Sequence, residues 1–168
     1  MTATFFNRGG VKKILIVGYP GCGKAFIMKQ LKIDPTQDFQ VLKAAFRRLE
    51  FNIFHLDENQ QDVWSDLFAN NFALVFVVDA TSSKEGLDQA SSLLHQMVHH
   101  PELSHSYILI YANNMDHPNA GTSSFLSEKL RIDSIQQPHH FQPCTATSDG
   151  ERIDTGLEWL IERMKATQ

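Results

Sequence analysis

Residues 18–25 read GYPGCGKA, a short stretch with three glycines followed by a lysine. The apolar run VKKILIVG at 11–18 leads into it and is typical of a buried strand. The segment KAFIMKQLK at 24–32 follows it with the apolar spacing of a helix. A strand, a glycine-rich turn and a helix in this order are the setting that a phosphate-binding loop requires. The stretch therefore predicts an α/β domain built around such a loop.

The loop matches the pattern G-x-x-x-x-G-K-[ST] at every position except the last, which is Ala25. Glycines at 18, 21 and 23 let the backbone turn tightly and direct N–H groups at an anion, and Lys24 would reach the outer phosphates as a point charge. The hydroxyl missing at Ala25 is the group that holds magnesium. We therefore expect a loop that binds phosphates without one of its metal ligands. The alternative, a turn that binds nothing, is disfavoured by the lysine.

Length and composition limit the class of protein. A chain of 168 residues with a net charge of −4 predicts one domain and argues against a nucleic-acid surface. Cys22 and Cys144 form no disulfide framework and suit a reducing, cytosolic compartment. No apolar run approaches about 18 residues, so no membrane span is expected. We expect a flexible segment at 1–10 and a single domain at 11–168.

Signals for lipid attachment are lacking at both ends of the sequence. Thr2 excludes N-myristoylation, and a C-terminal KATQ without cysteine excludes prenylation. Phe5 and Phe6 offer at most weak, peripheral membrane contact, and a disordered tail is the simpler reading of this segment.

Further strands and helices alternate along the chain. In the helix at 24–32, Phe26, Ile27 and Leu31 lie on the predicted apolar side. This alternation predicts a layered fold with a mostly parallel sheet, whose ligands bind at the carboxyl ends of the strands. The remaining elements predicted are a hairpin of strands 39–46 and 49–56 around Arg47–Arg48, strands 72–79 and 106–113, and helices 85–100, 123–132 and 151–165.

Several histidines are candidate metal ligands. His95 and His99 are four residues apart on the predicted helix, a spacing that can bind a metal. No third ligand accompanies them, so we expect a solvated helix face. His139 and His140 are expected at the surface as well.

Five further features, in order along the chain, resemble motifs of small GTPases of the Arf/Sar (ADP-ribosylation-factor-like) branch. The most specific is ANNMDHPNA at 112–120, which is similar to the family's A-N-K-Q-D-L-P-N-A. The resemblance implies a P-loop small-GTPase fold, with a mixed, mostly parallel six-stranded sheet flanked by helices on both faces, and GTP or GDP as ligand. The other features are PTQDFQV at 35–41, the hairpin spacing from Val41 to Phe51, VFVVDA at 75–80, and CTATSDG at 144–150 with GLEWL at 156–160.

Guanine recognition is implied by the same resemblance. Asn113 and Asp116 match the N-K-x-D motif, in which the carboxylate accepts two hydrogen bonds from the edge of guanine. Asn114 replaces the lysine whose stem lies along the base, and Ala146 would offer its N–H to guanine O6. The alternative is that residues 113–116 are simply the polar end of a strand. The candidate nucleotide-binding residues are Gly18, Tyr19, Pro20, Gly21, Cys22, Gly23, Lys24, Ala25, Thr36, Asn113, Asn114, Asp116, Thr145, Ala146 and Thr147.

The metal half of the site departs from the family pattern. Thr36 matches the threonine that ligates magnesium, although it also suits an ordinary turn and follows Lys24 at a shorter distance than in the family. In FHLDENQQ at 54–61, His55 replaces the family's aspartate, and Asp57 and Glu58 replace two glycines. Thr36 is thus the one candidate metal ligand, at a weakened Mg²⁺ site.

The same segment is where a catalytic group would lie. Asn59, Gln60 and Gln61 are candidates to orient an attacking water, but without the glycine turn none is expected to be held in place. Loss of the metal ligands and of this turn predicts impaired hydrolysis, and no catalytic residue is assigned.

These observations leave three functions open. The first is an Arf-like guanine-nucleotide-binding switch in intracellular or vesicle transport, cytoplasmic and at most peripheral to membranes. The second is a catalytically dead scaffold that presents its interswitch hairpin to a protein partner. The third, a P-loop enzyme such as a nucleoside kinase, leaves residues 113–116 and 144–148 unexplained.

Overall fold

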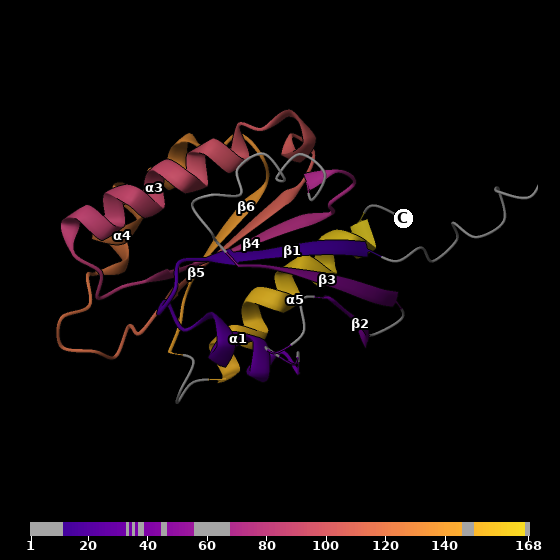
Figure 1. The fold of residues 1–168 in the computed structure, drawn as a ribbon, viewed down its shortest axis with the longest axis horizontal. Helices are drawn as coiled ribbons and strands as arrows, with labels where there is room; N and C mark the ends of the chain where they lie inside the picture. The colour runs from indigo at the N-terminus through magenta and orange to yellow at the C-terminus, as the bar shows by residue number, and fades with distance from the viewer. Residues whose placement is uncertain are drawn as a thin grey trace, which may run out of the picture.

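The computed structural model describes residues 12–32, 34, 36, 39–44, 47–55, 68–145 and 150–166. Within them lies a six-stranded sheet in the order β2-β3-β1-β4-β5-β6 (Figure 1). Every pairing is parallel except that of β2 with β3. The mixed, mostly parallel six-stranded sheet is therefore confirmed. The strands are β1 (Lys12–Gly18), β2 (Phe39–Ala44), β3 (Arg47–His55), β4 (Ala73–Asp79), β5 (Tyr107–Asn113) and β6 (His139–Pro143).

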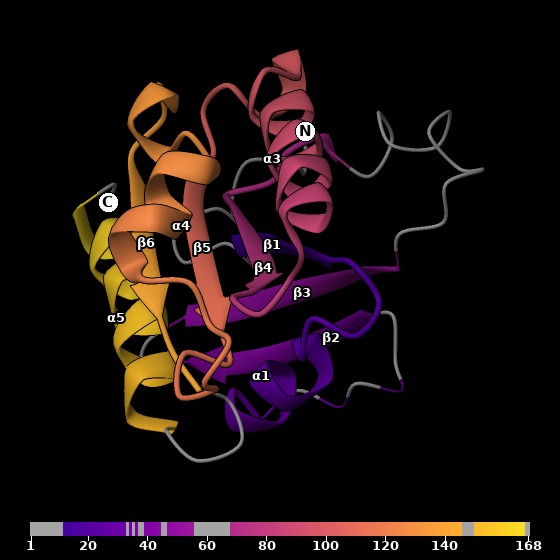
Figure 2. The same ribbon diagram turned by 90° about the vertical axis from the view of Figure 1, so that its left-hand side faces the viewer.

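Alternation along the central strands creates two hydrophobic layers, because successive side chains of a strand point to opposite faces. Leu15, Leu74 and Ile108 face helices α3 (Lys84–Val98) and α4 (Ser123–Lys129). Ile14, Val75 and Leu109 face helices α1 (Lys24–Gln30) and α5 (Gly150–Ala166). Figures 1 and 2 show these two pairs of helices on opposite sides of the sheet. Two short 3₁₀ helices, η2 (Pro101–Leu103) and η3 (Ile132–Ser134), complete the fold.

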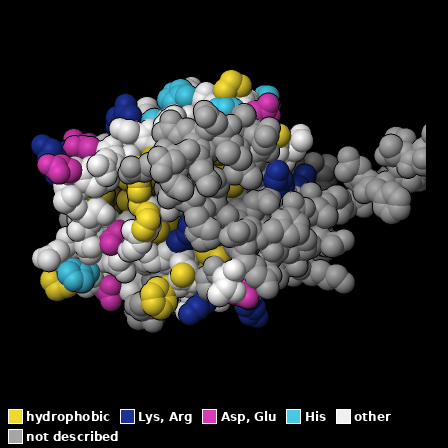
Figure 3. All heavy atoms as spheres, viewed as in Figure 1, with side chains coloured by type: hydrophobic (Ala, Val, Ile, Leu, Met, Phe, Trp, Pro, Cys, Tyr) yellow, Lys and Arg dark blue, Asp and Glu magenta, His cyan; other side chains and the backbone are white. Residues whose placement is uncertain are grey.

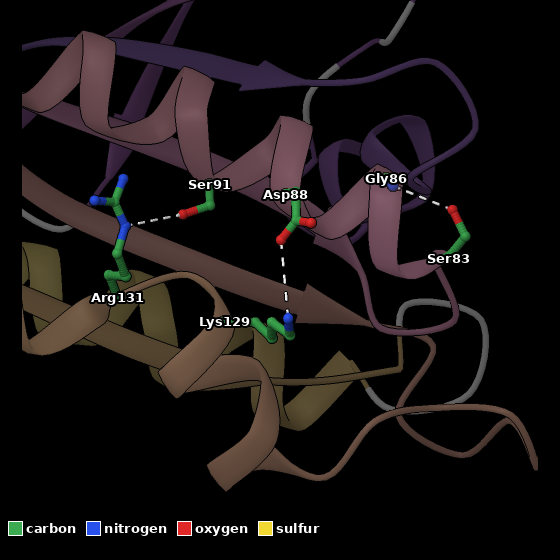
Figure 4. Close-up of polar contacts among 6 residues, drawn as sticks. All are labelled: Ser83, Gly86, Asp88, Ser91, Lys129 and Arg131. Atoms are coloured by element: carbon green, nitrogen blue, oxygen red, sulfur yellow. Dashed lines mark hydrogen bonds and ion pairs between the residues drawn. The ribbon is translucent and has the colours of Figure 1, made fainter.

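Polar contacts fix α3 against α4 (Figure 4). Ser83 caps α3 by accepting from the N–H of Gly86 at 3.1 Å, which explains why the helix starts there. Lys129 Nζ lies 3.9 Å from Asp88 Oδ1 on the exposed side of the contact. Further along, Arg131 Nε donates to Ser91 Oγ at 3.5 Å. The first contact defines the start of α3, and the other two link α3 to α4 and to the residues that follow α4.

The expectation that His95 lies on a solvated face of its helix is wrong. It is buried, and its Nε2–H donates to the carbonyl of Leu130 at 2.9 Å. The carbonyls at the end of a helix lack intrahelical partners, so this side chain satisfies one at the end of α4. His99 remains exposed and donates through Nδ1 to the carbonyl of His95 at 2.6 Å. Over the described ranges, no group of three or more His, Cys, Asp or Glu could hold a metal ion.

Three other expectations need correction. Arg47 and Arg48 lie in β3 rather than in the hairpin turn, because Ala44 pairs with Arg47 and leaves only positions 45–46 to connect the strands. The helix predicted to 132 ends at Lys129, since Arg131 adopts a left-handed φ of 50°. Of the three residues predicted on the apolar side of α1, Ile27 and Leu31 are buried but Phe26 is exposed. Met28 is buried in addition.

Strand β6 was not located from the sequence. It begins at His139 and His140, which are half-buried rather than at the surface. The ring of His140 stacks on Trp159 of α5 with centroids 5.5 Å apart. In the part of the chain that the structure describes, no helix has both the length and the apolar character of a membrane span.

Candidate functional site

The glycine-rich loop leaves the carboxyl end of β1, beside the ends of β3 and β4. Gly18 pairs with His55 on one side and with Val77 on the other. A Cβ at Gly18 would lie 2.7 Å from Cys22 Sγ and 3.0 Å from the carbonyl of Val77. Only glycine fits at this point, so the backbone turns tightly as soon as the strand ends.

The loop then takes two left-handed steps, at Gly21 with φ 82° and at Gly23 with φ 85°. Between them the N–H of Cys22 donates to the carbonyl of Tyr19 at 3.2 Å. Helix α1 begins at Lys24, directly after Gly23. The loop borders a cavity of about 390 Å³, within the range typical of small-ligand sites. The cavity is lined by Gly18, Tyr19, Pro20, Gly21, Gly23, Lys24, Ala25 and Phe26.

Asn113 joins this loop to the end of β5. The side chain is 1% exposed, and its Nδ2 donates to the carbonyl of Cys22 at 3.0 Å. Gly23 packs so closely on Asn113 that an added Cβ would overlap the amide nitrogen. The sequence placed these residues in two separate motifs, 91 positions apart, and the structure brings them into contact.

The loop that follows β5 is shaped by its asparagine. Asn114 has a φ of 64°, a left-handed conformation that asparagine tolerates better than most residues. The N–H of Met115 donates to the carbonyl of Cys144 at 3.2 Å, which ties this loop to the segment after β6. Asp116 is exposed and Thr145 is buried. Ala146 and Thr147 lie outside the described residues.

Both cysteines flank the same asparagine. Cys22 and Cys144 are buried, and the thiol of Cys144 lies 3.9 Å from Asn113 Oδ1. Burial raises the pKa of the Cys22 thiol, which disfavours the reactive thiolate. Cys22 lies within the phosphate loop and Cys144 directly after β6, and both thiols are buried.

Thr36 is held by a carboxylate of its own turn. Its N–H and its hydroxyl both donate to Asp34 Oδ1, at 2.9 Å and 2.7 Å. These hydrogen bonds lower the pKa of the Asp34 carboxyl. These two hydrogen bonds to Asp34 are the contacts that the structure describes for Thr36.

Three described residues lie at positions that match the magnesium-binding residues of the family pattern: Ala25, Thr36 and His55. Ala25 supplies no oxygen, and the hydroxyl of Thr36 is engaged by Asp34. The register places His55, at the end of β3, opposite Gly18, where the family pattern has an aspartate. Residues 56–67, which include Asp57, Glu58 and the glutamines at 60 and 61, lie outside the described residues.

Phe26 is the site residue that sequence reasoning assigned elsewhere. The spacing of apolar residues placed it on the buried side of α1, yet it lines the cavity beside Lys24. A signal was available, because Phe26 shares its helix side with Lys29 and Gln30, three and four positions on. Asp79, at the end of β4, lines a second cavity of about 290 Å³ between the loop and α3, and its Oδ1 accepts from Thr81.

Comparison with known proteins agrees with this architecture. The family model described as "ADP-ribosylation factor family" matches residues 2–164. ADP-ribosylation factor-like protein 1 of Saccharomyces cerevisiae (strain ATCC 204508 / S288c) is 32% identical over 164 residues, which cover 93% of this chain and 89% of the yeast protein.

Proposed function

The chain belongs to the ADP-ribosylation factor family of GTP-binding proteins, and we propose that it is a guanine-nucleotide switch with a degraded magnesium site and impaired hydrolysis. The hydrogen bond from Asn113 to the carbonyl of Cys22 supports the nucleotide-binding part of this proposal. It joins the phosphate loop to the segment that holds Asp116, so that one ligand can engage both. A guanine nucleotide fits such a site, because it has phosphates at one end and a base at the other.

Each half of the site has its own task. The glycine turn and Lys24 bind the phosphates, because glycine lets backbone N–H groups approach an anion and the lysine adds charge. The exposed carboxylate of Asp116 accepts from guanine N1 and N2, a donor pair that adenine lacks. Thr145, which is buried directly after β6, and the following Ala146 and Thr147 are proposed to contact the base, as the resemblance implies.

Magnesium is proposed to contribute only weakly to phosphate binding. Ala25 lines the cavity without the hydroxyl of the family pattern, and the Thr36 hydroxyl donates to Asp34. A triphosphate has more charge to neutralise than a diphosphate, so we expect binding of GTP to be weakened more than binding of GDP.

The biological role follows from the family and from the edge of the sheet. We infer a switch in intracellular or vesicle transport, in the cytoplasm and at most weakly peripheral to membranes. Strand β2 lies at the edge of the sheet, where unpaired backbone groups are open to another chain. This supports an effector contact through β2 and β3, and also favours the alternative of a nucleotide-bound scaffold that does not hydrolyse.

Restoring the missing oxygen tests the metal proposal. Ala25→Thr adds a hydroxyl and Ala25→Val adds similar volume without one. We expect the threonine variant to gain magnesium-dependent affinity for GTP, by roughly 5- to 150-fold, the range of a hydrogen bond to a charged group. Neither variant should raise single-turnover hydrolysis. Equal affinities for the two variants, with and without chelator, would show that no metal position remains to be repaired.

A further inference from the structure

Phe26 is not explained by the packing of the fold. Its neighbours Ile27 and Met28 are at most 1% exposed, whereas Phe26 is 51% exposed. Among the described residues, only Phe125 is a comparably exposed large hydrophobic side chain. Figure 3 shows hydrophobic side chains on the viewed face as scattered spots rather than one continuous patch. Phe26 thus combines an exposed side chain with a place in the lining of a cavity.

The position of Phe26 ties it to both halves of the site. It is in the first turn of α1, and its N–H donates to the carbonyl of Gly23 at 3.1 Å. Gly23 is also the residue that packs on Asn113. Gly23 therefore contacts both the backbone of Phe26 and the side chain at the end of β5, which carries the predicted base-recognition loop. The ring itself lines the cavity together with Lys24 and Ala25.

Lys29 sits next to the ring. Its Nζ lies 5.8 Å from the centroid of Phe26, within the reach of a cation–π contact. The two residues are three positions apart, so the contact lies on one side of the helix. It restrains the ring while about half of the residue stays exposed.

A phenyl ring suits one part of a nucleotide. It offers no donor or positive charge to a phosphate, but it provides a flat apolar face for a base. This chain needs such a face, since Asn114 is too short to lie along the base as a lysine stem does. Asp116 can read the edge of guanine but cannot cover its plane.

We propose that Phe26 is a nucleotide-binding residue, on whose ring the base of the bound guanine nucleotide stacks in place of the missing lysine stem. The proposal rests on the proposed function, because it takes guanine nucleotide as the ligand of the site. It assigns an additional contact to the phosphate-loop helix and gives the exposed aromatic ring its use.

The test compares Phe26→Ala with Phe125→Ala, which removes the other exposed phenyl ring from α4. Titration calorimetry measures binding of GDP and, by competition, of pyrophosphate. Phe26→Ala should weaken GDP binding by roughly 5- to 150-fold, the effect of removing an aromatic ring that stacks on a base. It should leave pyrophosphate binding unchanged, and Phe125→Ala should leave both unchanged. Alanine in an exposed helix position keeps the fold, since it is the strongest helix former.

Two more variants separate stacking from bulk. Phe26→Trp should retain GDP affinity, whereas Phe26→Leu, which keeps apolar volume without a ring, should lose most of it. Equal GDP binding by Phe26→Ala and Phe125→Ala would overturn the proposal, as would tighter binding by Phe26→Ala, an equal loss for pyrophosphate, or full affinity in Phe26→Leu. A wild-type protein that binds no guanine nucleotide would overturn the proposed function itself, which is a different result.

Discussion

Gly21 and Gly23 form a natural pair for testing how the phosphate loop is held. Both have a left-handed φ, 82° and 85°, so alanine is strained to a similar degree at either position. Their surroundings differ. A Cβ at Gly21 meets nothing within 4 Å, whereas a Cβ at Gly23 overlaps the amide nitrogen of Asn113. Comparing Gly23→Ala with Gly21→Ala therefore isolates the contact with Asn113 from the backbone strain that both share.

The expected magnitudes follow from these two terms. A left-handed conformation costs an L-residue about 1–2 kcal/mol, so Gly21→Ala should lower the free energy of unfolding by that amount. Gly23→Ala must also displace Asn113, which leaves the carbonyl of Cys22 without its buried donor at a cost of about 1–3 kcal/mol. The total for Gly23→Ala is about 2–5 kcal/mol.

Urea unfolding followed by far-ultraviolet circular dichroism gives both free energies, and a GDP titration gives the binding. A double-mutant cycle completes the design. Adding Asn113→Ala to Gly23→Ala removes the overlapping amide, so its cost should be smaller there than in the wild-type protein. Equal destabilisation by the two glycine variants, together with an additive cycle, would refute the tether between the loop and β5.

The remaining predictions concern specificity, pH and packing. Asp116→Asn should shift the base preference from guanine toward xanthine in competition titrations, because the amide offers a donor where xanthine has a carbonyl; equal wild-type binding of ATP and GTP would contradict the assignment. Burial lowers the pKa of His95, so its contribution to stability is present above about pH 6.5 and lost as the pH falls below it; urea unfolding from pH 8 to 5.5 should show this loss in the wild type and less of it in His95→Gln. Gly156→Ala should destabilise by about 1–3 kcal/mol in thermal unfolding, since the new Cβ would lie 2.7 Å from the hydroxyl of Tyr111 and disturb its hydrogen bond to Ile153, outweighing the gain in helix propensity; an unchanged midpoint would argue against this packing.

The central sheet was predictable because its strands carry a simple signal. Runs such as FALVFVVD are apolar throughout, as expected of parallel strands covered on both faces. Strand β6, with the sequence HHFQP, has no such run and is partly exposed along its length. It is recognised as a strand only through its pairing with β5, which a local pattern does not contain.

Side-chain burial on the helices was harder to predict than the helices themselves. His95 is buried because α4 ends at Leu130 and presents a carbonyl there, a tertiary feature that the sequence of α3 does not reveal. Phe26 shows the opposite error. An apolar residue at helical spacing was assigned to the core, although the short helix α1 buries Met28 instead.

The sequence predicted the separate motifs of the site, but not the contacts that join them. The sequence indicated a phosphate loop and a guanine motif, which lie at the carboxyl ends of β1 and β5, two parallel strands separated in the sheet by β4. The contact of Asn113 with Cys22 and Gly23 depends on backbone geometry that no motif states. The switch segment at 56–67 and the residues Ala146 and Thr147 remain predictions from the sequence alone.

The most direct test of the account is a titration of the purified, nucleotide-stripped protein with GDP and with ADP, each in magnesium and in excess chelator. The account predicts that GDP binds, that ADP does not, and that the GDP affinity is the same in both buffers, because Asp116 selects the base and Ala25 leaves no metal ligand in the loop. Absence of GDP binding, binding of ADP as tight as that of GDP, or loss of GDP affinity in chelator would contradict it.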